Sequence, residues 1–390
     1  MSSSNRRNFL KNLGSAPVAA GLASACQGSR RTLKKDPTGK YDVAYRKLGS
    51  TGYKVSELGF GAMNTRDEEL VQAAIDSGIN YIDTAHGYMK GENERIVGNV
   101  LKRNNNRDKV FLATKVYFKN KTSDELRGMM ELSLKRLQVD HVDTMFMHMP
   151  DESETVFDEK WIKTFDKARK DGLCRYVGVS IHTNHADLIN ACVDSNFWEF
   201  VLVGYNYHSP TDVTAAIERA RKAGLAIVAM KTQKRCKEKG YPNHNAEVTD
   251  NQAALKWVLQ NPNIDTTIPG MTAFEQLTED LAVMGMKMTI ADRLSLNSYS
   301  QNNSVSSCRG VSGCTGCLKK CPKGVEICEI NRCLGYAYGY DDIELAHENY
   351  AMLPTERRID VCDDCEKCKV KCVNGLDLTR SVRLARELFV

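Results

Sequence analysis

The sequence predicts an α/β protein in which a (β/α)8 TIM barrel is followed by a small cysteine-rich domain. Two observations lead to this prediction. Short apolar runs alternate with amphipathic stretches from residue 45 onward, and ten of the 14 cysteines lie between Cys308 and Cys372. Alternation of strands with helices is typical of a parallel sheet covered by helices. We therefore divide the 390 residues into a leader (1–40), a barrel (41–292) and a cysteine-rich domain (293–390).

Eight apolar runs form the predicted barrel strands, and each has the composition of a strand that is buried on both faces. They are residues 58–63, 81–85, 110–116, 144–148, 176–181, 200–205, 226–231 and 266–270. Apolar residues at helical spacing predict helices at 67–76, 123–137, 161–170, 213–222 and 252–259. A hairpin is expected at 45–55, where Gly49 and Gly52 mark the turn.

The charge distribution argues against a nucleic-acid-binding protein. The net charge is only +5, and the 54 lysines and arginines are spread over stretches that also carry acidic residues. This mixture is typical of an ordinary solvated surface. We therefore expect a small-molecule ligand and no nucleic-acid partner.

Four polar residues stand at or just after the C-terminal ends of predicted strands, where a barrel enzyme carries its chemistry. Asp83 and Tyr88 follow the second strand, Lys115 the third and His148 the fourth. An ammonium beside a tyrosine favours the phenolate, which brings a phenol with a reference pKa of about 10 closer to neutral pH. Such a tyrosine can donate a proton, and a histidine can donate a hydrogen bond to a carbonyl oxygen.

The stretch from Asn80 to Glu94 reads Asn-Tyr-Ile-Asp-Thr-Ala-x-x-Tyr-x-x-Gly-x-x-Glu and resembles the signature of the aldo-keto reductases. The resemblance implies a (β/α)8 barrel that reduces a small-molecule carbonyl substrate with NADP or NAD as cofactor. It also implies a catalytic tetrad: Tyr88 as proton donor, Lys115 and Asp83 as its support, and His148 at the substrate carbonyl. Each residue taken alone could be an ordinary solvated or core side chain without a catalytic role. Four matches at the positions of the family signature make this explanation less favoured.

Further matches to the family imply cofactor contacts. Gly178-Val179-Ser180 resembles the segment that meets the nicotinamide carboxamide, and Ile268-Pro269-Gly270 resembles the loop over the adenosine phosphates. The implied contacts are Ser180, Tyr205, Lys231, Pro269, Gly270 and Gln276. The arginine that often follows to bind a 2′-phosphate is absent, so NADP and NAD both stay open. Lys234 and Arg235 are alternative sources of positive charge.

Two cysteine runs have the spacing of iron-sulfur ligands. Cys362, Cys365, Cys368 and Cys372 are separated by two, two and three residues, as in bacterial ferredoxins. Cys314, Cys317 and Cys321 repeat most of that run before a proline. The resemblance to ferredoxins implies a small ferredoxin-like domain that binds one or two [4Fe-4S] clusters.

The earlier cysteine run is incomplete, because Val311 stands where the repeat demands a cysteine. Cys308 is the expected replacement, while Cys328 and Cys333 remain candidates. In the ferredoxin pattern the fourth cysteine of each run serves the other cluster. The implied ligands are Cys321 with Cys362, Cys365 and Cys368, and Cys372 with Cys308, Cys314 and Cys317. Tetrahedral zinc and disulfide bonds are the alternatives.

The leader resembles a twin-arginine export signal. Arg6 and Arg7 precede a mild apolar run at 12–25 that is too short and too rich in glycine and serine to span a membrane. Cleavage after Ala25 and lipid attachment at Cys26 both fit its end, and a plain basic leader on a cytoplasmic reductase is the alternative. We expect a protein exported by the twin-arginine route, periplasmic or lipid-anchored to the outer face of a membrane.

These observations predict an NAD(P)H-dependent oxidoreductase that carries iron-sulfur clusters. A nicotinamide passes two electrons as a hydride whereas a cluster passes single electrons, and the sequence has no clear flavin motif to convert one into the other. The clusters are therefore expected to be structural or to serve a partner redox protein. A second hypothesis is an exported electron-transfer or redox-binding module whose barrel binds nucleotide without carbonyl turnover.

Overall fold

The structure is a computed structural model of the chain, and it describes most of the barrel and part of the C-terminal region. The described residues are 43–233, 249–303, 316–317, 321–339, 343–362, 370–373 and 376–390, together with Cys308 and Cys314. Several residues singled out in the sequence lie outside this set: Arg6, Arg7, Cys26, Lys234, Arg235, Val311, Cys365 and Cys368.

Eight parallel strands form the predicted barrel, in the order of the chain. They are β3 (Phe60–Gly61), β4 (Tyr81–Asp83), β5 (Phe111–Tyr117), β6 (Val142–His148), β7 (Cys174–Ile181), β8 (Phe200–Gly204), β9 (Ala226–Met230) and β10 (Thr266–Thr267). The first and last strands meet, because the Gly59 amide donates to the Thr267 carbonyl over 2.6 Å and the Gly61 amide to the Pro269 carbonyl over 3.1 Å. The predicted α/β barrel is therefore confirmed.

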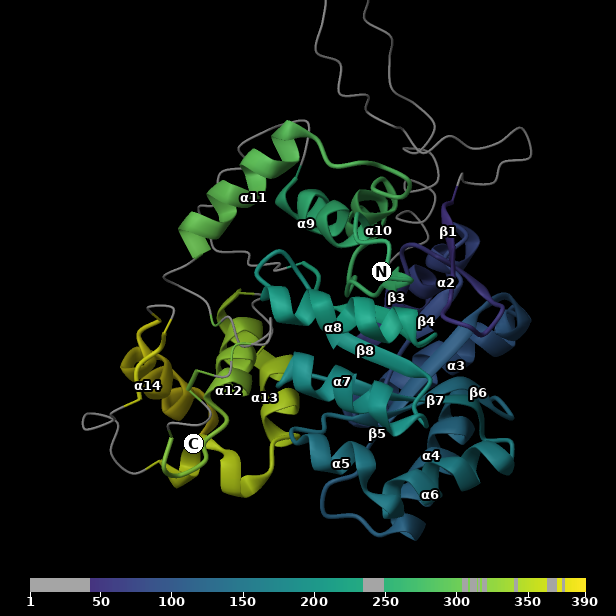
Figure 1. Cartoon of the computed structure of the whole chain (residues 1–390), viewed down its shortest axis with the longest axis horizontal. Coiled ribbons are helices and arrows are strands. Elements are labelled where there is room, and N and C mark those ends of the chain that lie inside the picture. Colours follow the sequence, from purple (N-terminus) through teal and green to yellow (C-terminus); the bar gives the residue numbers. More distant parts are fainter. Residues whose placement is uncertain are drawn as a thin grey trace, which may run out of the picture.

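Helices surround the strands, as Figure 1 shows. They are α2 (Glu68–Asp76), α3 (Glu92–Arg103), α4 (Ser123–Leu137), α5 (Ser153–Phe157), α6 (Glu159–Lys170), α7 (His185–Ser195), α8 (Thr211–Lys222), α9 (Asp250–Leu259) and α10 (Phe274–Leu281). The five predicted helices are confirmed, although α6, α8 and α9 each begin two residues earlier than expected. Their first turns are polar, so apolar spacing does not detect them, whereas the capping side chains of Asp158 and Thr249 do mark two of the starts.

A hairpin closes the N-terminal end of the barrel. Strands β1 (Tyr45–Lys47) and β2 (Lys54–Ser56) pair antiparallel, as predicted. Leu48 of the connecting turn is fully buried in the same apolar cluster as Tyr81 and Phe111 of the barrel interior. Gly49 allows this close approach, because a Cβ there would lie 2.7 Å from the Ala226 amide nitrogen and its φ is +51°.

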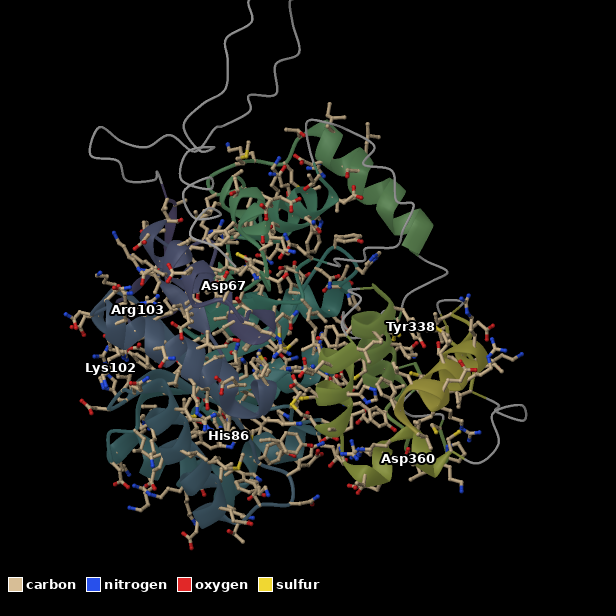
Figure 2. The ribbon with its side chains drawn as sticks, turned by 180° about the vertical axis from the view of Figure 1, so that it is seen from behind. Asp67, His86, Lys102, Arg103, Tyr338 and Asp360 are labelled. Carbon is tan, nitrogen blue, oxygen red and sulfur yellow. The ribbon has the colours of Figure 1, made fainter. Side chains whose placement is uncertain are left out.

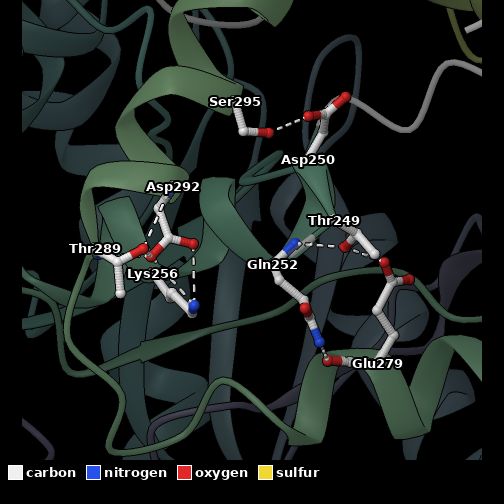
Figure 3. Close-up of polar contacts among 8 residues, drawn as sticks. All are labelled: Thr249, Asp250, Gln252, Lys256, Glu279, Thr289, Asp292 and Ser295. Carbon is white, nitrogen blue, oxygen red and sulfur yellow. Dashed lines mark hydrogen bonds and ion pairs between the residues drawn. The ribbon is translucent and has the colours of Figure 1, made fainter. Parts of the chain in front are cut away.

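Helix α11 (Ile290–Asn303) packs on α9 and continues the chain beyond the barrel. Figure 3 shows the contact: Lys256 Nζ lies 3.0 Å from Asp292 Oδ1, and the Thr289 amide donates to Asp292 Oδ2 over 2.7 Å. The predicted boundary between residues 292 and 293 falls inside this helix. The helix continues through its Ser/Asn-rich second half to Asn303.

The described C-terminal region is helical and has its own apolar core. Its elements are α12 (Ile327–Leu334), a π-helical turn (Gly335–Gly339), α13 (Ile343–Ala351), 3-10 turns at Thr355–Arg357 and Ile359–Val361, and α14 (Leu378–Phe389). Val325, Ile330 and Ile359 are among its buried core residues. Figure 2 locates the region by Tyr338 and Asp360, away from Lys102 and Arg103 of the barrel. The ferredoxin-like fold stays a prediction.

No helix within the described residues is long and apolar enough to cross a bilayer.

Candidate active site

The four predicted tetrad residues lie together at the C-terminal end of the barrel. Lys115 Nζ is 2.5 Å from Asp83 Oδ1, 2.6 Å from the Thr84 carbonyl oxygen and 3.3 Å from the Tyr88 hydroxyl. The His148 ring packs edge-on against Tyr88 with 6.3 Å between the ring centroids. Asp83 and His148 are the last residues of β4 and β6, and Lys115 lies within β5. The sheet therefore brings the four side chains to one place.

Burial and charge set the protonation states of this group. Burial raises the pKa of Tyr88; the ammonium of Lys115 opposes this effect without cancelling it. Burial lowers the pKa of Lys115, but the charges and hydrogen bonds of Asp83 and Tyr88 together outweigh this effect, so the net pKa is raised. The phenol is therefore protonated and the lysine charged at neutral pH, the states that a proton donor and its electrostatic support require.

His148 is neutral and has an open hydrogen-bonding atom. Burial lowers its pKa well below 6.5, and the nearby charge of Lys115 lowers it further. Its Nε2 atom is buried and makes no hydrogen bond to the described residues. A neutral imidazole with a free Nε2 beside the tyrosine is positioned to bind a carbonyl oxygen.

The loop that carries Tyr88 is held by a partly buried arginine, Arg136. Met89 and Lys90 have left-handed backbone conformations, and Gly91 follows with φ of +93°. The Arg136 guanidinium fills the space beside Gly91, so a Cβ there would lie 2.2 Å from its Cζ. The same guanidinium donates to the His86 carbonyl over 3.0 Å and to Glu94 Oε2 over 3.3 Å. Gly91 and Glu94 of the signature therefore hold Arg136 against the loop: the glycine leaves space for the guanidinium, and the glutamate accepts a hydrogen bond from it.

Two of the implied cofactor residues lie next to the tetrad. Ser180 is fully buried, and its Oγ is 3.3 Å from His182 Nε2. Lys231 Nζ is 3.3 Å from the other ring nitrogen of His182. The rings of His182 and His148 are 5.3 Å apart. His182 is not among the residues predicted from the sequence; it lies two positions after Ser180 and directly follows Ile181, the last residue of β7.

The other implied cofactor residues are not brought to the tetrad in the same way. Tyr205 lies among the helices: its hydroxyl is 3.2 Å from Thr214 Oγ1, and its ring packs on Trp257 at 5.1 Å. Side chains alternate along a strand, so Tyr205 follows Val203 outward while Leu202 faces the interior. The cofactor contact predicted for Tyr205 stays a prediction, at a side chain that faces the helices and not the tetrad. Pro269 and Gly270 follow β10, where Gly270 pairs with Gly61, and Gln276 Oε1 accepts from the Thr272 amide over 2.9 Å.

The C-terminal region packs against the mouth of the barrel. Helix α13 contacts the turn Tyr88–Gly91, and Met352 Sδ lies 3.3 Å from the position that a Cβ on Gly87 would take. Arg357 forms ion pairs with Asp151 of the barrel and with Glu326, the latter at 2.7 Å. The four-residue tetrad therefore has the C-terminal region as its neighbour.

Helix α12 extends a chain of contacts from the tetrad into the C-terminal region. Glu329 Oε1 is 3.9 Å from Lys231 Nζ, and Glu329 Oε2 accepts from Arg332 Nε over 2.6 Å. Arg332 Nη1 donates to Asn349 Oδ1 over 2.9 Å. Sequence reasoning missed Glu329 and Arg332, whose only signal is their spacing of three residues between Cys328 and Cys333.

Most of the described cysteines of the C-terminal region lie in or against its apolar core. Cys328 Sγ lies 3.4 Å from Cys317 Sγ, and hydrogen bonding to Cys308 and Cys317 raises the pKa of the Cys328 thiol. Cys321, Cys362 and Cys372 belong to the same apolar cluster. Within the described part of the chain, no set of three or more metal-ligating side chains has the arrangement of a metal site. The structure does bring Cys328 into the group that was predicted around Cys308.

Comparison with known proteins agrees with the barrel fold. A model of the aldo/keto reductase family matches residues 57–235. The uncharacterized oxidoreductase YrpG of Bacillus subtilis is 30% identical over 310 residues, covering 63% of this chain and 92% of that protein.

Solved structures give the same result. A thermostable aldo-keto reductase in complex with the inhibitor epalrestat is 28% identical, with a TM-score of 0.55, and the match covers 65% of this chain and 99% of that one. An aldo-keto reductase of Klebsiella pneumoniae in complex with NADPH shares the fold, with 22% identity, a TM-score of 0.55 and coverage of 65% and 95%. The family match and the likeness to YrpG over most of its length show that this chain belongs to the aldo/keto reductase family of NAD(P)-dependent oxidoreductases.

Proposed function

We propose that the protein reduces a small-molecule carbonyl compound by hydride transfer from NADPH or NADH. The observation that carries this proposal is the position of Lys115 Nζ between Asp83 Oδ1 at 2.5 Å and the Tyr88 hydroxyl at 3.3 Å. The open Nε2 atom of His148 beside the same tyrosine supplies the fourth part of the arrangement.

The chain's own residues account for the proton and for the orientation of the substrate. A nicotinamide, when bound, supplies the hydride. Tyr88 donates its phenolic proton to the carbonyl oxygen as negative charge develops there, and the Lys115 ammonium stabilises the phenolate that remains. Asp83 keeps Lys115 charged and in place, while His148 Nε2–H binds the carbonyl oxygen and orients it.

The polar groups near His148 fit a nicotinamide cofactor. Ser180 and Lys231 offer a hydroxyl and an ammonium at the interior ends of β7 and β9, both within 3.3 Å of His182. The NADPH complex of the Klebsiella pneumoniae protein, which has the same fold, supports a cofactor of this class. Pro269, Gly270 and Gln276 remain the proposed contacts of its adenosine side.

Replacing Tyr88 by phenylalanine tests the proposal. We expect Tyr88→Phe to lower the rate of carbonyl-dependent NADPH oxidation by about a hundredfold to ten-thousandfold while NADPH still binds, because only the proton donor is lost. Tyr338→Phe, at a tyrosine that is 56% exposed in the C-terminal region, is the control and should keep the parent rate. Equal rates for parent and Tyr88→Phe would contradict the proposal, and nucleotide binding without turnover in the parent would favour the redox-binding module.

We also propose that the C-terminal region holds iron-sulfur clusters. Cysteine thiols are the ligands that iron-sulfur clusters take. Cys328 interacts with both Cys308 and Cys317, and Cys314 adjoins them, since its carbonyl is 3.7 Å from Cys328 Sγ. This arrangement favours Cys328 as a ligand of the earlier run, alongside or in place of Cys372. A cluster, when bound, passes single electrons and cross-links the small core around it.

Iron and sulfide analysis of anaerobically purified protein tests the cluster proposal. We expect Cys328→Ser to lose up to about half of the iron, because one of two clusters loses a ligand. Cys333→Ser is the matched control on the same helix and should retain the iron, since Cys333 is fully buried outside the group of three thiols. Zinc in place of iron in the parent would refute the proposal.

We propose, finally, that the chain is exported by the twin-arginine route and is periplasmic or anchored to the outer face of a membrane. The support is the Arg6-Arg7 pair ahead of the apolar run that ends at Cys26. The double change Arg6→Lys and Arg7→Lys should leave full-length protein in the cytoplasm, because the route recognises the guanidinium pair. Cys26→Ser should release the protein from the membrane only if Cys26 is lipidated. Equal export of parent and double-lysine forms would contradict the proposal.

A further inference from the structure

A cleft lies where the barrel mouth meets the C-terminal region. His182, which follows β7, lines this cleft together with Glu326 and Glu329 of the C-terminal region. The ring of His182 is 5.3 Å from that of His148, so the inner end of the cleft adjoins the tetrad. Charges of the C-terminal region therefore lie close enough to act on what the tetrad binds.

Five charged side chains of the described residues lie around this inner end, and their charges do not cancel. Asp83 pairs with Lys115 over 2.5 Å, and Glu329 pairs with Arg332 over 2.6 Å. Lys231 is the fifth, and its ion pair with Glu329 is long, at 3.9 Å. Three cations thus face two carboxylates, which leaves a surplus of one positive charge.

A second group of charges along the cleft is balanced. Lys119 pairs with Asp151 over 2.7 Å, and Arg357 pairs with Asp151 and, over 2.7 Å, with Glu326. Two cations face two carboxylates here. This group therefore leaves the surplus at the inner end unchanged.

Lys231 and Glu329 are both ionised at neutral pH. Burial, against the opposing charge of Glu329, lowers the pKa of Lys231 to about 8. Burial raises the pKa of Glu329, but the charges of Arg332 and Lys231 and the hydrogen bond from Arg332 outweigh this effect, so the net pKa is lowered. The positive charge also reaches His148, whose pKa is lowered by burial and lowered further by Lys115, Arg332 and Lys231.

The surplus charge lies beside the place where a nicotinamide must react. Lys231 Nζ is 3.3 Å from His182 Nδ1, and the other nitrogen of this ring is 3.3 Å from Ser180 Oγ. Hydride transfer requires the nicotinamide and the carbonyl to be in contact, and in the proposed function the carbonyl oxygen binds at His148. The positive charge that acts on His148 therefore acts on the nicotinamide as well.

We propose that Lys231 and Arg332 make the site discriminate between the two redox states of the cofactor. An oxidised nicotinamide ring carries a positive charge and a reduced ring is neutral, so a surplus positive charge weakens binding of the oxidised form relative to the reduced form. The proposal rests on the proposed function for the place of the nicotinamide. Arg332 lies outside residues 57–235, which match the family. The C-terminal region thereby favours release of the oxidised cofactor, which is a product of carbonyl reduction.

Dissociation constants of NADP⁺ and NADPH, measured by calorimetric titration of the full chain near neutral pH, test the proposal. We expect Lys231→Met to lower the ratio of the NADP⁺ constant to the NADPH constant about fivefold to tenfold, because one positive charge leaves a site with little water. Lys231→Arg keeps the charge and should keep the parent ratio. Ser180→Ala is the matched control: it removes a neutral contact, so it should weaken both nucleotides alike and leave the ratio unchanged.

Arg332→Met measures the share of the C-terminal region. We expect it to lower the same ratio about threefold to tenfold, with circular dichroism as the folding check. A lower ratio in both variants, without reduction of any carbonyl by the parent, would uphold the inference and overturn the proposed function. An unchanged ratio in both, in a parent that does reduce carbonyl compounds, would overturn the inference and leave the proposed function standing. A fall in Lys231→Met alone would overturn the role given to Arg332.

Discussion

Two buried ion pairs lie at the mouth of this barrel, and they differ in what holds them. Lys115 and Asp83 are 2.5 Å apart with side chains 1% and 3% exposed, and Arg332 and Glu329 are 2.6 Å apart with side chains 10% and 4% exposed. The first pair joins two neighbouring strands, β5 and β4. The second lies within one turn of α12, a helix of the C-terminal region.

The two pairs therefore depend on different parts of the fold. The register of the sheet fixes the first, because β5 is paired along its length with β4 and β6. The second reaches the active site only through the docking of α12 and α13 on the barrel, where Glu329 is 3.9 Å from Lys231. The difference teaches that the geometry of the tetrad is set by the sheet, whereas the position of Glu329 beside it depends on an interface that can be weakened separately.

The largest expected effect comes from removing the cation of each pair in turn. Lys115→Met should lower kcat for propanal by about a hundredfold to ten-thousandfold, because the tyrosine loses its charged support. Arg332→Met should lower it less than about tenfold, since Lys231 remains to balance Glu329. Steady-state kinetics with circular dichroism as a folding check measures both. Equal losses in the two variants would show that Arg332 belongs to the chemistry.

The next largest effect is expected where Gly91 packs against Arg136, because this contact holds the loop that carries Tyr88. Gly91→Ala should destabilise the barrel by about 1–3 kcal/mol and lower kcat, because the new Cβ meets the Arg136 guanidinium and the backbone is left-handed. Gly128→Ala is the matched control: Gly128 lies within α4, nothing lies within 4 Å of the position of its Cβ, and the change should stabilise by up to about 1 kcal/mol. Urea unfolding of both variants measures the difference, and a neutral Gly91→Ala would contradict the role given to Arg136.

Docking of the C-terminal region should give a smaller effect. Arg357→Ala removes the ion pairs to Asp151 and Glu326, and we expect amides of the turn Tyr88–Gly91 to exchange about tenfold faster with deuterium, because α13 packs on that turn. Arg66→Ala removes an exposed pair with Glu344 at 3.0 Å between the same two regions and should change exchange less than about twofold. Unchanged exchange in Arg357→Ala would show that docking does not rest on this arginine.

The barrel and its tetrad were predictable because their signals are local. Each strand is a contiguous apolar run, and the side chains of Asp83, Lys115 and His148 stand where parallel strands end or nearly end. Parallel strands bring their C-terminal ends together whatever the intervening loops do. The eight strands, the hairpin and five helices could therefore be predicted from the sequence. The ends of the strands differ from the predicted ones by up to three residues, and three helices begin two residues earlier than expected.

The cleft was not predictable, because it arises from the meeting of distant segments. Glu326 and Glu329 are ordinary acidic residues in the sequence, and only the docking of α12 places them near His182. For Tyr205 a sequence motif predicts a cofactor contact. The alternation of side chains along the strand turns this side chain toward Trp257, which the motif alone does not indicate. Cys328 joined the group around Cys317 because α12 folds over it, which spacing alone left open.

The smallest effect concerns the pH dependence of barrel stability, and it contrasts a buried histidine of the barrel with an exposed one of the C-terminal region. His185 is 1% exposed, and burial, reinforced by the charge of Lys231, lowers its pKa to about 3. In the unfolded chain the ordinary value is about 6.5, so below that pH the unfolded state binds a proton that the folded state excludes. The stability due to the neutral ring is fully present above about pH 6.5 and declines by about 1.4 kcal/mol per pH unit as the pH falls toward the folded pKa.

Replacing His185 by glutamine should therefore flatten the pH dependence of the unfolding free energy. Tryptophan fluorescence during urea unfolding at about pH 7 and about pH 5 reports on the barrel alone, because Trp161, Trp198 and Trp257 all lie there. We expect the mean slope between these two pH values to be lower for His185→Gln than for the parent by about 1 kcal/mol per pH unit, because the unfolded ring is still mostly neutral above about pH 6.5. His347→Gln, on the exposed side of α13, is the control and should keep the parent slope. The histidines that remain in the barrel contribute equally to all three proteins, so an unchanged slope in His185→Gln would show that this ring takes up a proton in the folded state near its ordinary pKa.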